Sequence, residues 1–149
     1  LEGEILDKKT SYWKSKLNGV TALQLPLDYK RPAVRTVNGA SVNLLIEKEL
    51  ADQLNQLSQQ QGTTLFMTLL AIYKVLLYRY SGQQDICVGA SIANRPQQEL
   101  EGLLGFFVNT LALRTEVIET ATFTELLQQV KTTMMEAYEH QNVPFEKWV

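Results

Sequence analysis

The sequence is poor in the residues that most often build metal centres and nucleophilic active sites. Its 149 residues include one cysteine, Cys87, and one histidine, His140. One cysteine cannot form an internal disulfide, and one histidine cannot supply a histidine-rich metal site. The sequence also contains no serine or cysteine nucleophile elbow and no glycine-rich phosphate loop. We therefore expect neither a metal centre nor a disulfide scaffold.

The chain also lacks an excess of charge of one sign. Sixteen acidic residues against fourteen basic ones give a net charge of -2 at pH 7, and no cluster of basic residues marks a nucleic-acid surface. Apolar residues make up 45% of the chain, which is typical of a soluble globular protein. The longest apolar segment, residues 65–80, is shorter than the ~20 residues that cross a bilayer. Because residues 1–9 do not resemble a secretory signal, we expect a cytoplasmic domain without nucleic-acid or membrane partners.

The pattern of apolar residues and turn signals predicts helices packed on one sheet, in an α+β or α/β sandwich. Residues 65–80 are apolar on nearly every side, which predicts a central buried helix. Thr122 and Glu125 predict a capping box. In chain order, we expect a short helix with an aromatic anchor at Tyr12 and Trp13, an extended connector over residues 23–32, a strand over 40–46, helices over 47–61 and 65–80, a strand over 86–92 that is buried on both faces, a second strand over 106–115, and a helix over 123–138.

One polar cluster lies between the two strongest strand signals. Asn94, Arg95, Gly105 and Asn109 bracket a polar loop, where a fixed guanidinium and a buried amide could bind a carboxylate or a carbonyl. The structural alternative is that the arginine completes a buried ion pair, and the residues alone favour that alternative. Asn109 is expected to share a strand face with apolar residues.

The single histidine and the single cysteine offer weaker hypotheses. His140, beside Glu139 and near Glu146, could act as a general base oriented by a carboxylate. A histidine in the last turn of a helix more commonly meets the free carbonyls and the negative end of the helix dipole. Cys87 lies in the middle of a predicted strand, where a thiol behaves as a small apolar side chain and its thiolate is disfavoured.

Three ordered segments resemble successive core motifs of the condensation domains of nonribosomal peptide synthetases. They are DICVGASIANR at residues 85–95, GFFVNTL at 105–111 and HQNVPFE at 140–146. The Tyr12-Trp13 pair, the connector over 25–32 and residues 64–71 also resemble that family, so the resemblance runs over nearly the whole chain.

The resemblance implies a chloramphenicol-acetyltransferase-like fold of two lobes, with a tunnel between them where an acceptor amine attacks a donor thioester. Residues 1–149 are then expected to form part of the C-terminal lobe, as a half-fold with helices packed on one face of a mixed sheet. Residues 1–35 would be the inter-lobe helix and connector, and 36–149 the sheet and helix core. The family's catalytic pair of histidines, followed by Asp-Gly, is absent from this sequence. We therefore expect that this chain is a segment of such a domain and that the family's sequence continues beyond both of its ends. We also expect the segment to be inactive alone.

The resemblance also assigns roles to residues of this chain, none of them catalytic. Arg95 and Asn94 would support the active site, with the arginine reaching toward the aspartate of the absent histidine motif. The remaining assignments are tunnel-lining residues Gly105, Phe106, Phe107 and Asn109, and an architectural motif of His140, Gln141, Pro144, Phe145 and Glu146.

The function implied is peptide-bond formation between carrier-bound donor and acceptor groups in a parent synthetase. No cofactor would bind directly, because the substrates arrive on the phosphopantetheine arms of carrier domains. The implied partners are the N-terminal lobe, peptidyl carrier domains and an adjacent adenylation domain, with self-association through the exposed lobe interface. The alternatives are a noncatalytic module that docks a carrier or neighbouring domain, and an acyltransferase of the same superfamily that uses a coenzyme A thioester.

Overall fold

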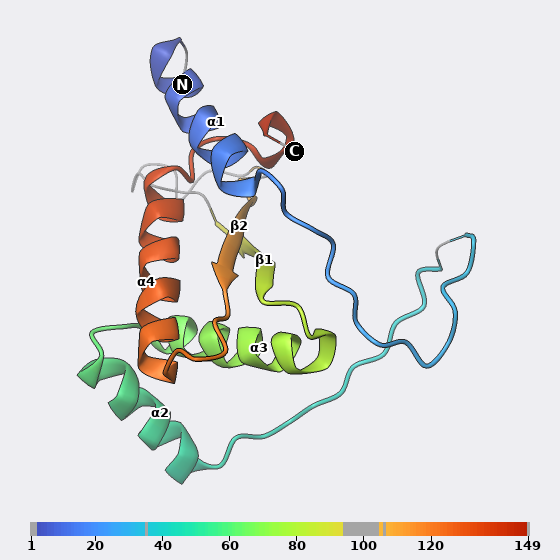
Figure 1. The fold of residues 1–149 in the computed structure, drawn as a ribbon, viewed down its shortest axis with the longest axis vertical. Helices are drawn as coiled ribbons and strands as arrows, with labels where there is room; N and C mark the ends of the chain where they lie inside the picture. Colours follow the sequence, from blue (N-terminus) through green and yellow to red (C-terminus); the bar gives the residue numbers. More distant parts are fainter. Residues whose placement is uncertain (1–2, 35, 94–104, 106, 149) are drawn as a thin grey trace.

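The computed structural model describes residues 3–34, 36–93, 105 and 107–148. Four α-helices, two strands and one 3-10 helix lie within these residues (Figure 1). They are α1 (Glu4–Leu17), α2 (Lys48–Gln60), α3 (Leu65–Ser81), β1 (Asp85–Ile92), β2 (Asn109–Glu116), α4 (Phe123–Glu139) and the 3-10 helix η2 (Phe145–Lys147). The helices and both main strands predicted from the sequence are present.

The described sheet is an antiparallel pair in which Asp85 faces Glu116 and Ile92 faces Asn109. The α+β class is confirmed. The prediction of a mixed sheet is wrong for the part of the chain that the structure describes, because its two strands are antiparallel. The prediction that the first strand is buried on both faces is also wrong, because in β1 Ile86 alone is fully buried. The apolar pattern could not reveal that β1 has a hydrogen-bonded neighbour on one side only among these residues.

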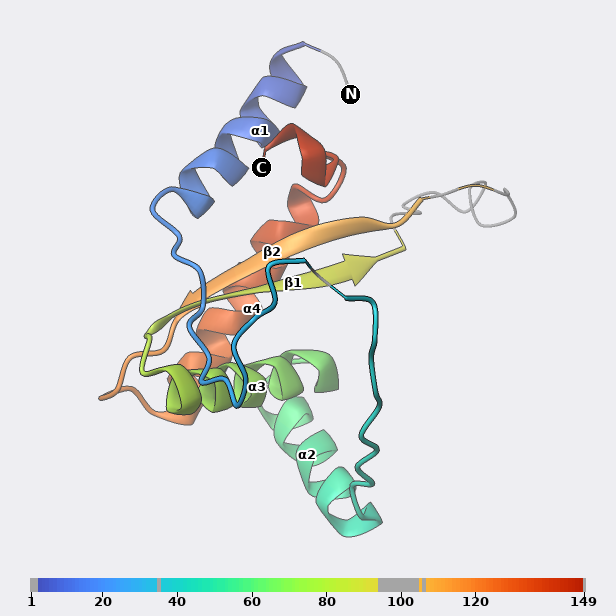
Figure 2. The same ribbon diagram turned by 90° about the vertical axis from the view of Figure 1, so that its right-hand side faces the viewer.

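The two longest helices, α3 and α4, pack on each other and on the strands. Residue alternation along β2 places Leu111, Leu113 and Thr115 on one face. On this face the Thr115 hydroxyl donates to the hydroxyl oxygen of Thr133 in α4 at 3.5 Å. Arg114 points to the opposite face and reaches the C-terminal end of α1. In both views α1 and η2 lie on one side of the strands and α2 and α3 on the other (Figure 2). The face that carries Leu111, Leu113 and Thr115 packs on α4, and Arg114 on the opposite face contacts the last residues of α1.

Local signals explain where the two long helices begin. The Thr122 hydroxyl accepts a hydrogen bond from the Glu125 amide at 3.3 Å, and the Glu125 carboxylate accepts one from the Thr122 amide at 2.7 Å. This confirms the predicted capping box. Thr64 caps α3 in the same way through the Met67 amide, at 3.2 Å. Gly82, at φ 71°, ends α3 in the left-handed conformation that glycine adopts without strain.

The helix α3 is only half covered, which corrects its predicted central position. Its inner side contributes Met67, Leu70, Ala71 and Leu77 to the core. Its outer side is apolar but open, with Phe66 51% exposed and Tyr73 47% exposed. The sequence correctly indicated apolar residues all round the helix, but it could not show that one side lacks a partner among the described residues.

The strand predicted over residues 40–46 is wrong. These residues belong to no helix or strand, and Val42 is 98% exposed. The described part of the 18–47 connector runs as a long irregular segment away from the helices (Figure 1). Alternating apolar residues form a strand only when a neighbouring strand accepts their hydrogen bonds, and no described segment does so here.

Among the described residues, no single helix is long and apolar enough to cross a membrane. The pair α2 and α3 meets the length and composition test together, but the two helices are bent by 105°.

Candidate functional site

Two of the three motif segments meet at the side chain of Asn109, the first residue of β2. Its Nδ2 donates to the carbonyl of Gln141 at 2.8 Å and to that of Val143 at 2.9 Å. Its Oδ1 accepts from the amide of Thr110 at 2.9 Å and from that of Phe145 at 3.1 Å. One buried amide therefore joins the start of β2 to the turn at residues 140–145.

These four hydrogen bonds use the whole capacity of the Asn109 side chain. A carboxamide has two N–H donors and two acceptor lone pairs. The side chain is also 8% exposed, so none of its polar atoms is free for a bound molecule. The prediction that Asn109 shares a face with apolar residues is confirmed by the burial of Leu111 and Leu113 on the same side of β2.

The remaining residues of the architectural motif lie around this turn. Phe145 contacts Trp148 edge to face at 4.7 Å between ring centres. Pro144 is exposed and precedes η2, and its carbonyl accepts from the Lys147 amide at 3.0 Å. Glu146 is exposed in η2. Gln141 is half-buried and contributes its backbone carbonyl to Asn109.

Helix α1 closes the C-terminal end of α4. Trp13 Nε1 donates to the His140 carbonyl at 3.1 Å, and Lys9 Nζ donates to the Glu139 carbonyl at 2.7 Å. The last carbonyls of a helix have no partner within the helix, so α1 supplies partners for these two, and the Val143 amide also donates to the His140 carbonyl at 3.4 Å. Trp13 is 1% exposed and stacks on Trp148 at 4.7 Å. The aromatic anchor predicted from the sequence is confirmed.

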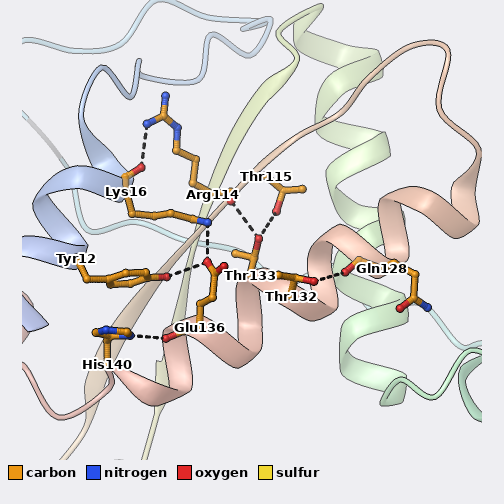
Figure 3. A network of polar contacts seen from close by, with 9 residues as sticks. All are labelled: Tyr12, Lys16, Arg114, Thr115, Gln128, Thr132, Thr133, Glu136 and His140. Atoms are coloured by element: carbon orange, nitrogen blue, oxygen red, sulfur yellow. Dashed lines mark hydrogen bonds and ion pairs between the residues drawn. The ribbon is translucent and has the colours of Figure 1, made fainter.

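A polar cluster around Glu136 completes the contact between α1 and α4 (Figure 3). The Glu136 carboxylate lies 2.9 Å from Lys16 Nζ and accepts from the Tyr12 hydroxyl at 3.4 Å. Burial raises the pKa of Tyr12, and the charge of Glu136 raises it further. The ring of His140 stacks on Tyr12 at 3.8 Å, and its Nδ1 lies 2.8 Å from the Glu136 backbone carbonyl.

This geometry supports the structural interpretation of His140. A general base needs a carboxylate that orients its ring and a free nitrogen facing the reacting group. Here Nδ1 meets a backbone carbonyl, and the described contacts contain no bond from Glu139 or Glu146 to the ring.

Arg114 was not singled out by the sequence, although it joins three elements. Its Nε and Nη2 each donate to the Asp85 carboxylate at 2.8 Å, and Nη1 donates to the carbonyls of Lys16 at 2.9 Å and Asn18 at 2.8 Å. The hydrogen bonds to Asp85 raise the pKa of Arg114. A position within a strand carries no sequence signal for a contact with the end of α1.

Lys74 is a second polar residue with several hydrogen bonds that the sequence analysis did not identify as a candidate. Its side chain is completely buried, and Nζ donates to the carbonyls of Ile86 at 2.9 Å and Leu113 at 2.6 Å. Burial lowers the pKa of Lys74 to about 8. Cys87 is half-buried, and burial raises the pKa of its thiol, in line with the predicted inert role.

Two hollows flank these clusters. One of about 810 Å³ lies between β2 and α4 and includes Lys16 and Arg114, but both cations are paired with carboxylates, so the lining offers no free positive charge. The other, of about 380 Å³, is apolar and lies between the open side of α3 and β1, where Phe66, Leu69 and Tyr73 line it. The described residues hold no group of three or more metal-binding side chains.

Several predicted site residues have no described position. Asn94, Arg95 and Phe106 lie outside the described residues. Gly105 and Phe107 are described and lie close together, since a side chain added at Gly105 would meet the Phe107 ring at 3.0 Å. The support role of Arg95 and the tunnel-lining role of the 105–109 segment stay predictions.

Comparison with known proteins places these motifs in a wider group. The chain is 55% identical over 150 residues to a linear gramicidin synthase protein of Brevibacillus parabrevis, a match that covers 100% of this chain but 3% of that protein. A crystal structure of a holo four-domain nonribosomal peptide synthetase bound to AMP and glycine superposes with a TM-score of 0.94 at 28% identity, over 100% of this chain and 11% of that one. The complex of the X-domain and OxyB from teicoplanin biosynthesis superposes with a TM-score of 0.90 at 26% identity, over 97% of this chain and 32% of that one.

These relatives show the fold and the family. The likeness in structure confirms the α+β, chloramphenicol-acetyltransferase-like fold that the motifs implied. The chain spans only a small part of the curated relatives and about a third of the X-domain chain. The family model described as Condensation domain matches residues 1–149, so this chain belongs to the condensation-domain family.

Proposed function

We propose that this chain is part of a condensation domain that joins two carrier-bound groups through a peptide bond. The observation that carries the proposal is the family match over residues 1–149. The interlocked motif segments add support, because Asn109 connects 105–111 to 140–146 within one packed unit.

The reaction would be an acyl transfer between tethered substrates. The nitrogen of the acceptor amine attacks the carbonyl carbon of the donor thioester, a C–N bond forms, and the C–S bond breaks. The amine loses a proton and the donor arm leaves as a free thiol, so the atoms balance without an oxidant or reductant. Both substrates would arrive on phosphopantetheine arms of carrier domains. Orientation of two bound reactants can lower a barrier by roughly 7 to 11 kcal/mol, and this would be the main contribution of the protein.

Within the domain, residues 1–149 would form part of the C-terminal lobe. Residues 1–35 would be the inter-lobe helix and connector, and 36–149 the sheet and helix core. Arg95 and Asn94 would support the active site, and the 105–109 segment would line the tunnel. The only histidine of the chain, His140, is held at the end of α4, so the chain alone would not catalyse the reaction.

The partners would be the N-terminal lobe, carrier domains and an adjacent adenylation domain, in the cytoplasm. The open apolar side of α3 supports an extensive contact, because an apolar patch of this kind usually marks an interaction surface. When that contact is empty, the same side would promote self-association of the chain.

A second candidate function is domain docking without chemistry. The observation in its favour is the likeness to the X-domain, whose solved complex contains OxyB. A docking module would hold a partner and leave carrier-bound substrates unchanged.

The test is a transfer assay with the condensation domain that carries this chain and its flanking carriers. The donor carrier is loaded with an acyl-aminoacyl group and the acceptor carrier with an amino acid, and each carrier is weighed by intact mass spectrometry. We expect the acceptor carrier to gain the donor acyl mass, and a domain lacking residues 1–149 to give no gain. Carrier binding without any mass gain would support docking and contradict the proposed reaction.

A further inference from the structure

We propose that Asn109 is a positioning residue for peptide-bond formation, which it serves by locking the segment that leads into β2 against the turn at residues 140–145. This inference rests on the proposed function, and it assigns to Asn109 a role distinct from contact with substrate. The amide has no polar atom left for a ligand, since all four of its hydrogen bonds end on the chain.

The partners of Asn109 are all backbone groups, which makes the contact a fixed joint. Two are carbonyls of residues 141 and 143, and two are amides of residues 110 and 145. A buried backbone group that loses its partner destabilises the site more than the hydrogen bond itself contributed. The start of β2 and the turn can therefore not separate without exposing or orphaning polar groups.

The joint lies next to the segment that the family resemblance places on the tunnel. Phe107 is half-buried two residues before Asn109, and its ring packs so closely on Gly105 that an added side chain there would meet it at 3.0 Å. Asn109 is the anchor at the strand end.

The turn itself is fixed from its other side. Trp13 Nε1 donates to the His140 carbonyl at 3.1 Å, and Val143 is 1% exposed. A shift at Asn109 therefore cannot be absorbed by movement of the turn, and it would pass to Phe107 and its neighbours. Misplacement of a reacting group by about 1 Å costs on the order of a hundredfold in rate, so small shifts matter.

The experiment compares Asn109→Ala and Asn109→Asp with Thr115→Val in the full condensation domain with loaded carriers. Thr115 is a matched control, because it is buried on the same face of β2 and does not contact the turn. We expect the Asn109 variants to lower kcat for transfer by about tenfold to a hundredfold, with KM for the carriers little changed. We expect the kcat of Thr115→Val to stay within about twofold of the wild type.

The variant Asn109→Asp should give a pH dependence of kcat that a simple loss of stability would not produce. Its carboxylate would face the Gln141 and Val143 carbonyls, while its protonated form is close in shape to the amide and can donate one hydrogen bond. The ratio of its kcat to that of the wild type should therefore rise as the pH falls. The charged or titratable groups at this turn, His140, Glu146 and Lys147, are present in both proteins, so the ratio compares the two side chains at position 109 in the same surroundings.

The outcomes separate the two proposals. A wild-type domain that transfers no acyl group contradicts the proposed function. An active wild type, with Asn109 variants that are no slower than Thr115→Val and show no recovery at low pH, contradicts the positioning role alone.

Discussion

At the scale of single residues, three polar side chains hold the backbone in place. Asn109 contacts four backbone groups, Lys74 contacts two carbonyls, and Arg114 contacts two carbonyls as well as Asp85. Backbone carbonyls carry no sequence signal of their own. A sequence therefore shows such residues only as polar exceptions in apolar segments, without their partners.

Lys74 makes the free energy of unfolding depend on pH in the alkaline range. Its pKa is about 8 in the folded chain against 10.5 for an exposed lysine. Between these values the unfolded chain binds more protons than the folded one, so stability rises with pH from about 8 to 10.5, by about 3 kcal/mol. Below pH 8 both states are protonated and this contribution is constant.

The measurement is urea unfolding across this pH range for the wild type and for Lys74→Met. Cys87 has a raised pKa and acts in the opposite direction, but it is present in both proteins. The difference between the two stability profiles therefore reports Lys74 together with its effect on the Cys87 thiol, whose pKa the Lys74 charge lowers. Parallel stability profiles of the two proteins from pH 7.5 to 10.5 would contradict a lowered pKa of Lys74 in the folded chain.

Replacement of Arg114 by lysine should destabilise the fold by about 1 to 3 kcal/mol, because one ammonium cannot reproduce bonds to a carboxylate and two carbonyls. A double-mutant cycle with Asp85→Asn, read by urea unfolding, measures the share that belongs to the ion pair. The control is Lys48→Ala, which removes an exposed pair with Asp52 and should change stability by less than about 0.5 kcal/mol. Equal effects of the Arg114 and Lys48 changes would contradict the bridging role.

At the scale of elements, local signals predicted more than long-range pairing did. Thr122 and Glu125 fixed the start of α4, and the apolar stripe fixed its length, because both depend on residues close in sequence. Residues 40–46 had a strand pattern but have no strand to pair with among the described residues, and β1, which was expected to be buried on both faces, is mostly half-buried or exposed. Pairing depends on segments far away in the chain, which an apolar pattern does not specify. The motif segments at 105–111 and 140–146 were found by resemblance, but their connection through Asn109 appears only in three dimensions.

The capping box of α4 gives a prediction at this scale. Thr122→Ala removes the acceptor for the Glu125 amide and should lower the free energy of unfolding by about 1 kcal/mol. Thr124→Ala, at an exposed position in the same first turn, is the matched control and should have a smaller effect. Chemical denaturation of both variants measures the difference. A loss no larger for Thr122→Ala than for Thr124→Ala would mean that the box does not stabilise the helix.

At the scale of the whole molecule, the main feature is an apolar face left open along α3. Phe66, Leu69, Tyr73 and Leu76 are each exposed, and the groove beside them continues onto β1. We expect the isolated chain to self-associate through this face, since exposed apolar area of this kind is buried on contact.

Sedimentation velocity over a range of concentrations tests this expectation. The wild-type chain should form larger species as concentration rises, and Phe66→Glu should shift the distribution toward monomer. Val37→Glu changes a fully exposed residue of the connector and should leave the size distribution unchanged. A wild type that remains monomeric at every concentration would contradict self-association.

The measurement that tests the central claim most directly is the mass of the acceptor carrier after one round of reaction with the condensation domain that carries this chain. Donor and acceptor carriers are loaded, mixed with the domain and weighed intact. The proposed function predicts that the acceptor carrier gains the mass of the donor acyl group and the donor carrier loses it. Unchanged masses on both carriers, from a folded domain that still binds them, would contradict peptide-bond formation by this protein.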